Sequence, residues 1–164
     1  MIYSGLFVCI QLYRKLSLMK KEYLFICIFL FIISGLRSQT KEIDSLQNLL
    51  DNHEKNDTVK VNLLNDIAYD LYTVNIDKTL IYAQEAGKLS VQLNYRKGIA
   101  ESLRLIGVFY TFKANYPMAL EYLHESLRIY EELGHKKGIS NCLNSIGIIY
   151  SNQGNYNKAL EYYL

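Results

Sequence analysis

Cys9 and Cys27 lie within residues 1–38, and the histidines and the one cysteine after them, which could bind a metal or act as a nucleophile, are His53, His124, His135 and Cys142. The histidines lie in different segments, and none has a second ligand at the spacing that a zinc site uses. Cys142 lies in a helical pattern and has no basic neighbour in the sequence to lower its pKa. We therefore expect surface histidines, a structural cysteine, no metal and no cofactor.

A pair of carboxylates, Glu121 and Glu125, is separated by one helical turn. Such a pair can act as a general acid and base. On an amphipathic helix, however, two carboxylates at this spacing are typical of a solvated face. No glycine-rich phosphate-binding loop occurs in the sequence either, so we expect that the chain is not an enzyme.

The elements that would position these residues are organised by an internal repeat with a period of forty positions. Residues 97–124 align with 137–164 without a gap, so that Ile106-Gly107 matches Ile146-Gly147. A weaker earlier copy, residues 75–98, matches 115–138 at the same offset. A fixed offset of this size is typical of a helical repeat array.

Each unit contains two amphipathic helical patterns. Apolar residues recur every three or four positions in both halves of the second unit: Ile99, Leu103, Ile106 and Tyr110, then Leu120, Leu123, Leu127 and Tyr130. Asn115 is a predicted N-cap, and Pro117 falls in the first helical turn, where its missing N–H costs no hydrogen bond. Upstream, residues 41–52 are predicted to form a short helix that covers the start of the array, with Ile43, Leu46, Leu49 and Leu50 on one side. Asp57 or Thr58 is predicted to cap the helix that follows.

These residues resemble the tetratricopeptide repeats, whose pattern is met by Leu103, Ile106-Gly107, Tyr110, Ala119 and their counterparts one period further on. The resemblance implies an all-α fold, a right-handed solenoid of antiparallel helix pairs. It covers residues 58–164 as about three units, the last one truncated, which suggests a fragment of a longer protein. The period exceeds the commonest one of about 34 residues, and we expect the extra residues to lengthen the second helix. The longer period is similar to that of a subgroup found in bacterial sensors and regulators.

The N-terminal residues 1–38 are predicted to be a leader. Residues 23–36 carry no charge and follow Lys20-Lys21, a pattern typical of a signal peptide, with cleavage expected after Ser38. The apolar run is shorter than the roughly 20 residues of a spanning helix, although an uncleaved anchor remains the alternative. Met19 would be a more natural start. Residues 39–57 then form the lead helix and a loop.

Five of the 18 basic residues but only one of the 16 acidic residues lie in this leader, which leaves residues 39–164 with a net charge of −2. Such a balance gives no reason to expect nucleic acid as a partner. We expect a protein or peptide instead, and contact with a membrane only through the leader or a downstream span.

In the tetratricopeptide family the first helices of the pairs line a concave groove. The resemblance places in that groove Asn62, Asn65, Tyr69 and Tyr72 of the first unit, Glu101, Arg104, Val108 and Thr111 of the second, and Asn141, Asn144, Ile148 and Ser151 of the third. The Asn amides, each a donor and an acceptor, suit an extended peptide backbone. The Lys and Asn pair with which some members clamp a C-terminal carboxylate is absent. The alternative is a groove that packs only against a downstream segment of the same protein.

We therefore expect a protein-binding scaffold that is exported and lies in the periplasm or faces it from the membrane. The architecture resembles the extracytoplasmic sensory part of bacterial membrane signalling proteins, of histidine-kinase or regulator type. A free periplasmic or envelope adaptor is one alternative. A repeat appendage of an enzyme whose catalytic domain lies outside this chain is another.

Overall fold

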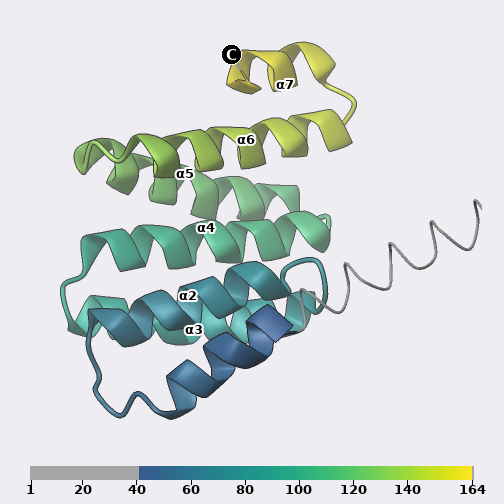
Figure 1. Cartoon of the computed structure of the whole chain (residues 1–164). Helices are drawn as coiled ribbons and strands as arrows, with labels where there is room; N and C mark the ends of the chain where they lie inside the picture. The colour runs from purple at the N-terminus through teal and green to yellow at the C-terminus, as the bar shows by residue number, and fades with distance from the viewer. Residues whose placement is uncertain (1–40, 164) are drawn as a thin grey trace, which may run out of the picture. The chain divides into compact units, whose positions relative to one another are not determined.

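The computed structural model describes residues 41–163, and the predicted leader, residues 1–38 with Met19, lies outside them. Every regular element in the described part of the chain is a helix, with no strand (Figure 1). Residues 41–51 form a lead helix, and the helices that follow are α2 (Thr58–Leu71), α3 (Ile76–Gln92), α4 (Arg96–Phe112), α5 (Tyr116–Glu132), α6 (Lys136–Asn152) and α7 (Tyr156–Tyr163). Between residues 41 and 163, no helix is both long and apolar enough to cross a membrane.

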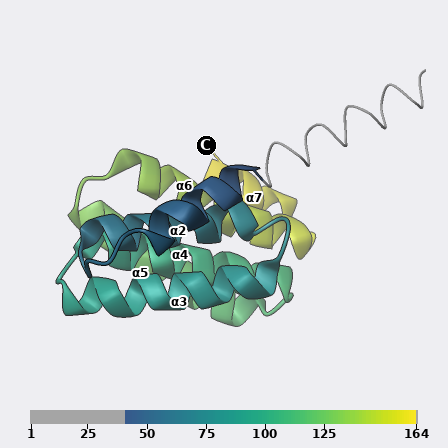
Figure 2. The ribbon, with the colours of Figure 1, turned by 60° about the horizontal axis from the view of Figure 1, so that its bottom comes forward.

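The helices stack in the order of the sequence, each packed against the next from α2 to α7 (Figures 1 and 2). The first helices of the pairs also contact one another, α2 with α4 and α4 with α6. The second helices α3 and α5 make no such contact within the described part of the chain. One side of the stack is therefore a continuous row of first helices, which is the predicted arrangement of a helical repeat.

A left-handed residue closes every helix from α3 to α6, at equal intervals along the sequence: Asn94 (φ 52°), Ala114 (φ 56°), Gly134 (φ 61°) and Gly154 (φ 76°). In each turn the next N–H donates to the carbonyl five residues earlier, as Asn115 N does to Tyr110 O at 2.9 Å. This is the Schellman closure of a helix C-terminus. The helices α3, α4, α5 and α6 are all 17 residues long, so the first and second helices of a unit are equal in length.

The predicted helix starts are confirmed. Asp57 accepts hydrogen bonds from the N–H groups of Val59 and Lys60 at the start of α2, and Asn115 caps α5 with Pro117 in its first turn. In the lead helix, Leu50 packs against the first core cluster, and Gln47 accepts a 2.7 Å hydrogen bond from the Tyr82 hydroxyl. Leu49, however, is 55% exposed, so the prediction that it shares the buried side is wrong. The lead helix uses a narrower apolar stripe than the sequence indicated.

The repeat glycines mark the closest approach of two helices. A Cβ at Gly107 would lie 2.7 Å from Cγ of Leu123 and 3.2 Å from the carbonyl oxygen of Ala119. Leu123 and Ala119 are fully buried, so α4 and α5 pack backbone to backbone here. The next unit repeats the architecture, including the stacked ring pair Tyr150–Tyr162 at 5.4 Å, which matches Tyr110–Tyr122 at 5.5 Å.

Candidate functional site: the groove of the first helices

The row of first helices carries two adjoining cavities that share the side chains of Tyr69, Arg104 and Asn141. The apolar cavity has a volume of about 280 Å³ and is also lined by Tyr72, Leu105, Val108, Thr111, Phe112, Asn144, Ser145 and Ile148. The polar cavity has a volume of about 560 Å³ and is also lined by Asn62, Asn65, Asp66, Lys97, Gly98, Glu101, Tyr130, His135, Lys137 and Gly138. Together they form the groove.

The predicted groove residues fall on these two cavities with one exception. Asn62, Asn65 and Glu101 line the polar cavity, and Tyr72, Val108, Thr111, Asn144 and Ile148 line the apolar cavity, whereas the three shared side chains line both. Ser151, in the last turns of α6, is half-buried and lines neither. The structure thus gathers these side chains in one place, and their role in binding stays a prediction.

The apolar cavity is bordered by aromatic rings from two helices. The ring of Tyr72 lies between Tyr69, at 5.5 Å, and Phe112, at 6.1 Å in an edge-to-face arrangement. Tyr69 is 49% exposed, Phe112 56% and Ile148 40%. Large apolar side chains left in water on a concave surface are typical of a binding site.

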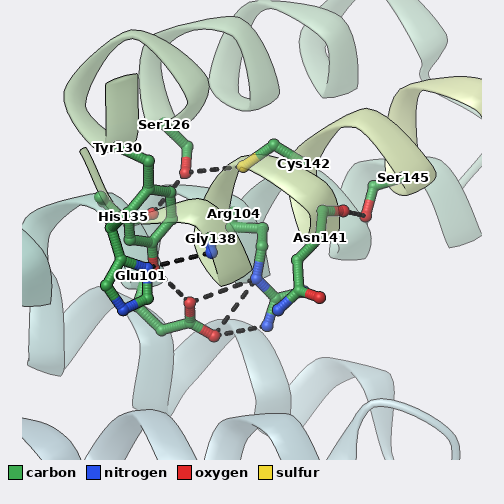
Figure 3. Close-up of polar contacts among 10 residues, drawn as sticks. Glu101, Arg104, Ser126, Tyr130, His135, Gly138, Asn141, Cys142 and Ser145 are labelled. Atoms are coloured by element: carbon green, nitrogen blue, oxygen red, sulfur yellow. Dashed lines mark hydrogen bonds and ion pairs between the residues drawn. The ribbon is translucent and has the colours of Figure 1, made fainter. Parts of the chain in front are cut away.

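The polar cavity has a buried ion pair at its floor. Arg104, 5% exposed, donates from Nε to both carboxylate oxygens of Glu101 at 3.2 and 3.3 Å, and its Nη2 also contacts Glu101. The Tyr130 hydroxyl, from the end of α5, donates to the same carboxylate (Figure 3). The guanidinium also lies 5.7 Å from the ring of Tyr69. The positive charge of Arg104 is therefore fully engaged inside the protein.

The pKa values of this cluster reflect that engagement. Burial alone would raise the pKa of Glu101, but the hydrogen bonds and charge of Arg104, with the Tyr130 hydroxyl, hold it below its ordinary value. Burial, followed by the charge of Glu101, raises the pKa of the Tyr130 hydroxyl. Both groups keep their usual charge states at neutral pH, which leaves an internally neutral cluster.

Asn65, next to this cluster on α2, carries the one buried side-chain oxygen or nitrogen that lacks a hydrogen-bond partner in the described part of the chain. The residue is only 4% exposed, and the orphan atom is its Oδ1. Buried polar groups are nearly always hydrogen-bonded, so an exception in a cavity needs an explanation. A missing ligand group is one such explanation.

Several lining residues were not predicted. Tyr130 and His135 enter from the end of α5 and the turn after it, where the preceding unit has Ser90 and Tyr95, so the repeat gave no signal for them. Asp66 also lines the polar cavity. Burial, followed by the negative charges of Glu101 and Asp70, raises the pKa of its carboxyl.

Two histidines are not the surface residues that we expected. His135 is half-buried, stacks on the Tyr130 ring at 5.2 Å, and accepts a hydrogen bond from Gly138 N at Nδ1. His53 is also half-buried and contacts the Asp57 carboxylate at 2.8 Å. His135 thus caps the start of α6, and His53 contacts the residue that caps the start of α2. Residues 41–163 contain no group of side chains that could hold a metal ion.

Cys142 lies in the core, not in the groove. It is fully buried, and its sulfur contacts the Ser126 hydroxyl at 3.2 Å, which donates to Ala100 O at 2.7 Å (Figure 3). Burial raises the pKa of the Cys142 thiol, although the Ser126 hydroxyl acts against this. A buried, protonated thiol is a packing residue rather than a nucleophile.

The sequence comparisons agree with this geometry. Residues 98–164 match the family model of the tetratricopeptide repeat. No curated protein matches the chain. The matched segment contains α5, α6, α7 and all of α4 but its first two residues, and it supplies most of the lining of both cavities.

Proposed function

Residues 98–164 belong to the tetratricopeptide repeat family, and from that premise we propose that the chain holds a peptide segment of another protein in the groove of α2, α4 and α6. Tetratricopeptide repeats are protein-interaction scaffolds, and this coarse function applies to the matched segment. The observation that carries the proposal is the row of partly exposed Tyr69, Phe112 and Ile148 side chains inside the groove.

The two cavities adjoin one another along the row of first helices, which suits a segment that runs along the groove. The apolar cavity has a volume of about 280 Å³. It therefore accommodates one or two side chains of a partner that continues along the groove. The adjoining polar cavity extends the contact in the direction of Asn62 and Lys97.

The groove can be tested with two matched sets of substitutions. A Tyr69→Ser, Phe112→Ser and Ile148→Ser variant removes the apolar groove surface. The control, Ile81→Ser with Val91→Ser, removes apolar side chains that are 61% and 62% exposed on α3. We expect affinity capture of partners to survive in the control and to fail in the groove variant. Equal recovery of the same partners by both variants would refute the groove as the site.

We further propose that the chain is exported and forms the extracytoplasmic sensory part of a bacterial membrane signalling protein. The support is the apolar stretch at residues 23–36 after Lys20-Lys21, together with the resemblance to long-period repeats. A periplasmic reporter fused after residue 164 should be active, and a reporter that is active only in the cytoplasm would contradict export.

The two alternatives lead to different results. Release of the native protein by osmotic shock without detergent would favour a free envelope adaptor over a membrane protein. A catalytic domain encoded in the same reading frame would favour a repeat appendage of an enzyme. A downstream apolar span followed by a signalling domain would support the sensory role.

A further inference from the structure

We propose that two copies of this chain associate through the outer face of α3, which packs antiparallel against the same helix of the second copy. Helix α3 contributes no side chain to either cavity of the groove, so this inference is independent of the proposed function. It assigns the chain a weak, twofold-symmetric dimer in which the groove of each copy stays free.

The outer face of α3 carries an apolar seam that its counterpart in the next unit lacks. Ile81 and Val91 are 61% and 62% exposed, and the exposed Gln84 and Lys88 lie between them. These four residues, which we call the α3 seam, recur at intervals of three, four and three positions, the spacing at which one helix packs along another. One period further on, α5 has only charged or titratable side chains at these positions: Glu121, His124, Arg128 and Glu131. The repeat itself therefore does not require the seam.

The α3 seam is symmetric about Ala86. Ile81 and Val91 lie five positions before and after it, and Gln84 and Lys88 lie two positions before and after it. In an antiparallel pair centred on Ala86, Ile81 of each copy therefore meets Val91 of the other, and Gln84 meets Lys88. A twofold contact requires this property, because the same surface must match itself in both directions. A second copy of the chain thus matches the seam at each of its four positions.

A cavity beside the seam provides room for the isoleucine of the second copy. It lies between α3 and α5, has a volume of about 350 Å³, and is lined by three apolar side chains of α4: Ile99, Leu103 and Ile106. Gly87 in its wall stands where the next unit has Leu127, which packs against two buried core clusters. The first unit thus lacks the leucine side chain that the next unit packs at this position. Because Val91 also lines the cavity, an Ile81 side chain that packs against Val91 can enter it.

The polar centre of the seam selects the antiparallel direction. Lys88 makes no ion pair with another residue in the described part of the chain, and the same is true of the exposed Glu85. In the antiparallel pair, the Lys88 ammonium faces the Gln84 carboxamide of the other copy and has Glu85 beside it. A parallel pair would place Lys88 against Lys88 of the other copy, and like charges at an interface repel. Charge and apolar packing therefore favour the same arrangement.

The first test is the association of the full 164-residue chain in solution. One helix from each copy forms the contact, which places it among the weak interfaces that bury less than about 1,200 Å² in total. Analytical ultracentrifugation should therefore show a monomer–dimer equilibrium between roughly 10 and 500 µM protein. Ile81→Glu should weaken dimerisation about tenfold or more, because the twofold axis places a carboxylate against Val91 at both ends of the seam. The control Val59→Glu, which replaces a 50% exposed apolar side chain on α2, should leave the equilibrium unchanged.

The decisive variant combines Ile81→Glu with Val91→Lys. In an antiparallel pair each new carboxylate meets a new ammonium of the other copy, so the double variant should dimerise at least about fivefold more tightly than either single variant. This recovery should be lost in about 0.5 M salt, because the new pairs are exposed. In a parallel pair like charges would meet, and the double variant would recover nothing. Circular dichroism spectra of all variants should coincide, since both positions are exposed.

Disulfide trapping tests the register of the two helices. When chains with Ile81→Cys are mixed with chains with Val91→Cys and oxidised, the disulfide between residue 81 of one copy and residue 91 of the other should exceed either like pair. The buried Cys142 does not compete for this bond. Mass spectrometry of the linked peptides distinguishes it from any bond to Cys9 or Cys27.

Three outcomes would overturn the dimer. They are an unmodified chain that stays monomeric up to about 500 µM, disulfides that form mainly between like positions, and an Ile81→Glu variant that dimerises as the unmodified chain does. The last result would place the contact on another surface, such as residues 1–38 or the exposed side of α7. The groove proposal would survive each of them, because the variant with Ile81→Ser and Val91→Ser should be monomeric and still capture the partners of the groove.

Discussion

The ion pair at the groove floor makes a sharp prediction about stability. Glu101→Gln keeps the shape of the side chain but removes the charge that faces Arg104, which is 5% exposed. Loss of one partner of a buried pair costs about 3–5 kcal/mol, because the remaining charge stays buried without compensation. With a shift of about 4 °C for each kcal/mol in a domain of this size, the melting temperature should fall by roughly 12–20 °C.

Two further variants separate the charge from the hydrogen bond. Tyr130→Phe removes only the hydroxyl that donates to Glu101, so it should cost about 1.5–3 kcal/mol, the range for a hydrogen bond to a charged group. The double variant Glu101→Leu with Arg104→Met replaces both charges by apolar groups and should be close to the unmodified chain in stability. Urea unfolding followed by far-ultraviolet circular dichroism measures all three.

The pH dependence gives an independent test of the same pair. Because Arg104 holds the pKa of Glu101 below its unfolded value, the pair stabilises the fold above the unfolded pKa of about 4.3. This contribution is lost as pH falls through the folded pKa. The difference in stability between the unmodified chain and Glu101→Gln should therefore be constant from pH 7 to about 5 and shrink below pH 4. A cost of less than about 1 kcal/mol at pH 7, or a double variant as unstable as the single one, would refute a buried, essential pair.

Three further predictions concern the scaffold. Ala114→Gly should stabilise the chain by about 0.5–1 kcal/mol, because glycine adopts the left-handed conformation at this position (φ 56°) without strain. Gly134→Ala (φ 61°) should destabilise the chain by a similar amount. In thermal melts the melting temperature should therefore rise for the first variant and fall for the second. Gly107→Ala should lower the free energy of unfolding by about 1–2 kcal/mol, because the new methyl group would meet the buried Leu123 and Ala119. Gly147→Ala should leave the free energy of unfolding unchanged or raise it by up to about 1 kcal/mol, because its nearest neighbour is the half-exposed ring of Tyr163. Equal losses of stability in urea unfolding would contradict this packing. Cys142 should resist alkylation in the native state and react in denaturant, as mapped by mass spectrometry; rapid labelling of the native chain would contradict its burial.

The helices were predictable because local rules and the repeat agree. An Asn before an apolar run, a proline in the first turn and apolar residues at helical spacing all locate α5, and the fixed offset between the repeat units then locates α7. The turn conformation was not predictable at Ala114, because alanine has no preference for positive φ. Gly134 and Gly154 occupy the equivalent position in their own turns, and only this equivalence shows that the repeat imposes the left-handed turn at the ends of α3 to α6.

The groove was predictable in part. Spacing along α4 places Glu101 and Arg104 on one face as a possible ion pair, but it does not reveal that the pair is buried under Tyr130. Tyr130 and His135 belong to a second helix and its turn, which differ from the preceding unit. Tertiary packing, rather than any local pattern, brings them to the polar cavity. The predicted Ser151 lies beyond the cavities because the groove ends before the last turns of α6.

Each of the three units contributes one row of side chains to the groove, and the middle row differs in chemistry from the two outer rows. At two equivalent positions the first and third units have asparagine, Asn62 with Asn65 and Asn141 with Asn144, whereas the middle unit has Glu101 with Arg104. In the charged row, Glu101 and Arg104 pair with each other, so this row contributes rigidity and shape rather than a free charge. In the amide rows on either side, Oδ1 of Asn65 is buried without a hydrogen-bond partner among the described residues. The repeat therefore keeps its packing positions and varies its groove positions without any change of fold.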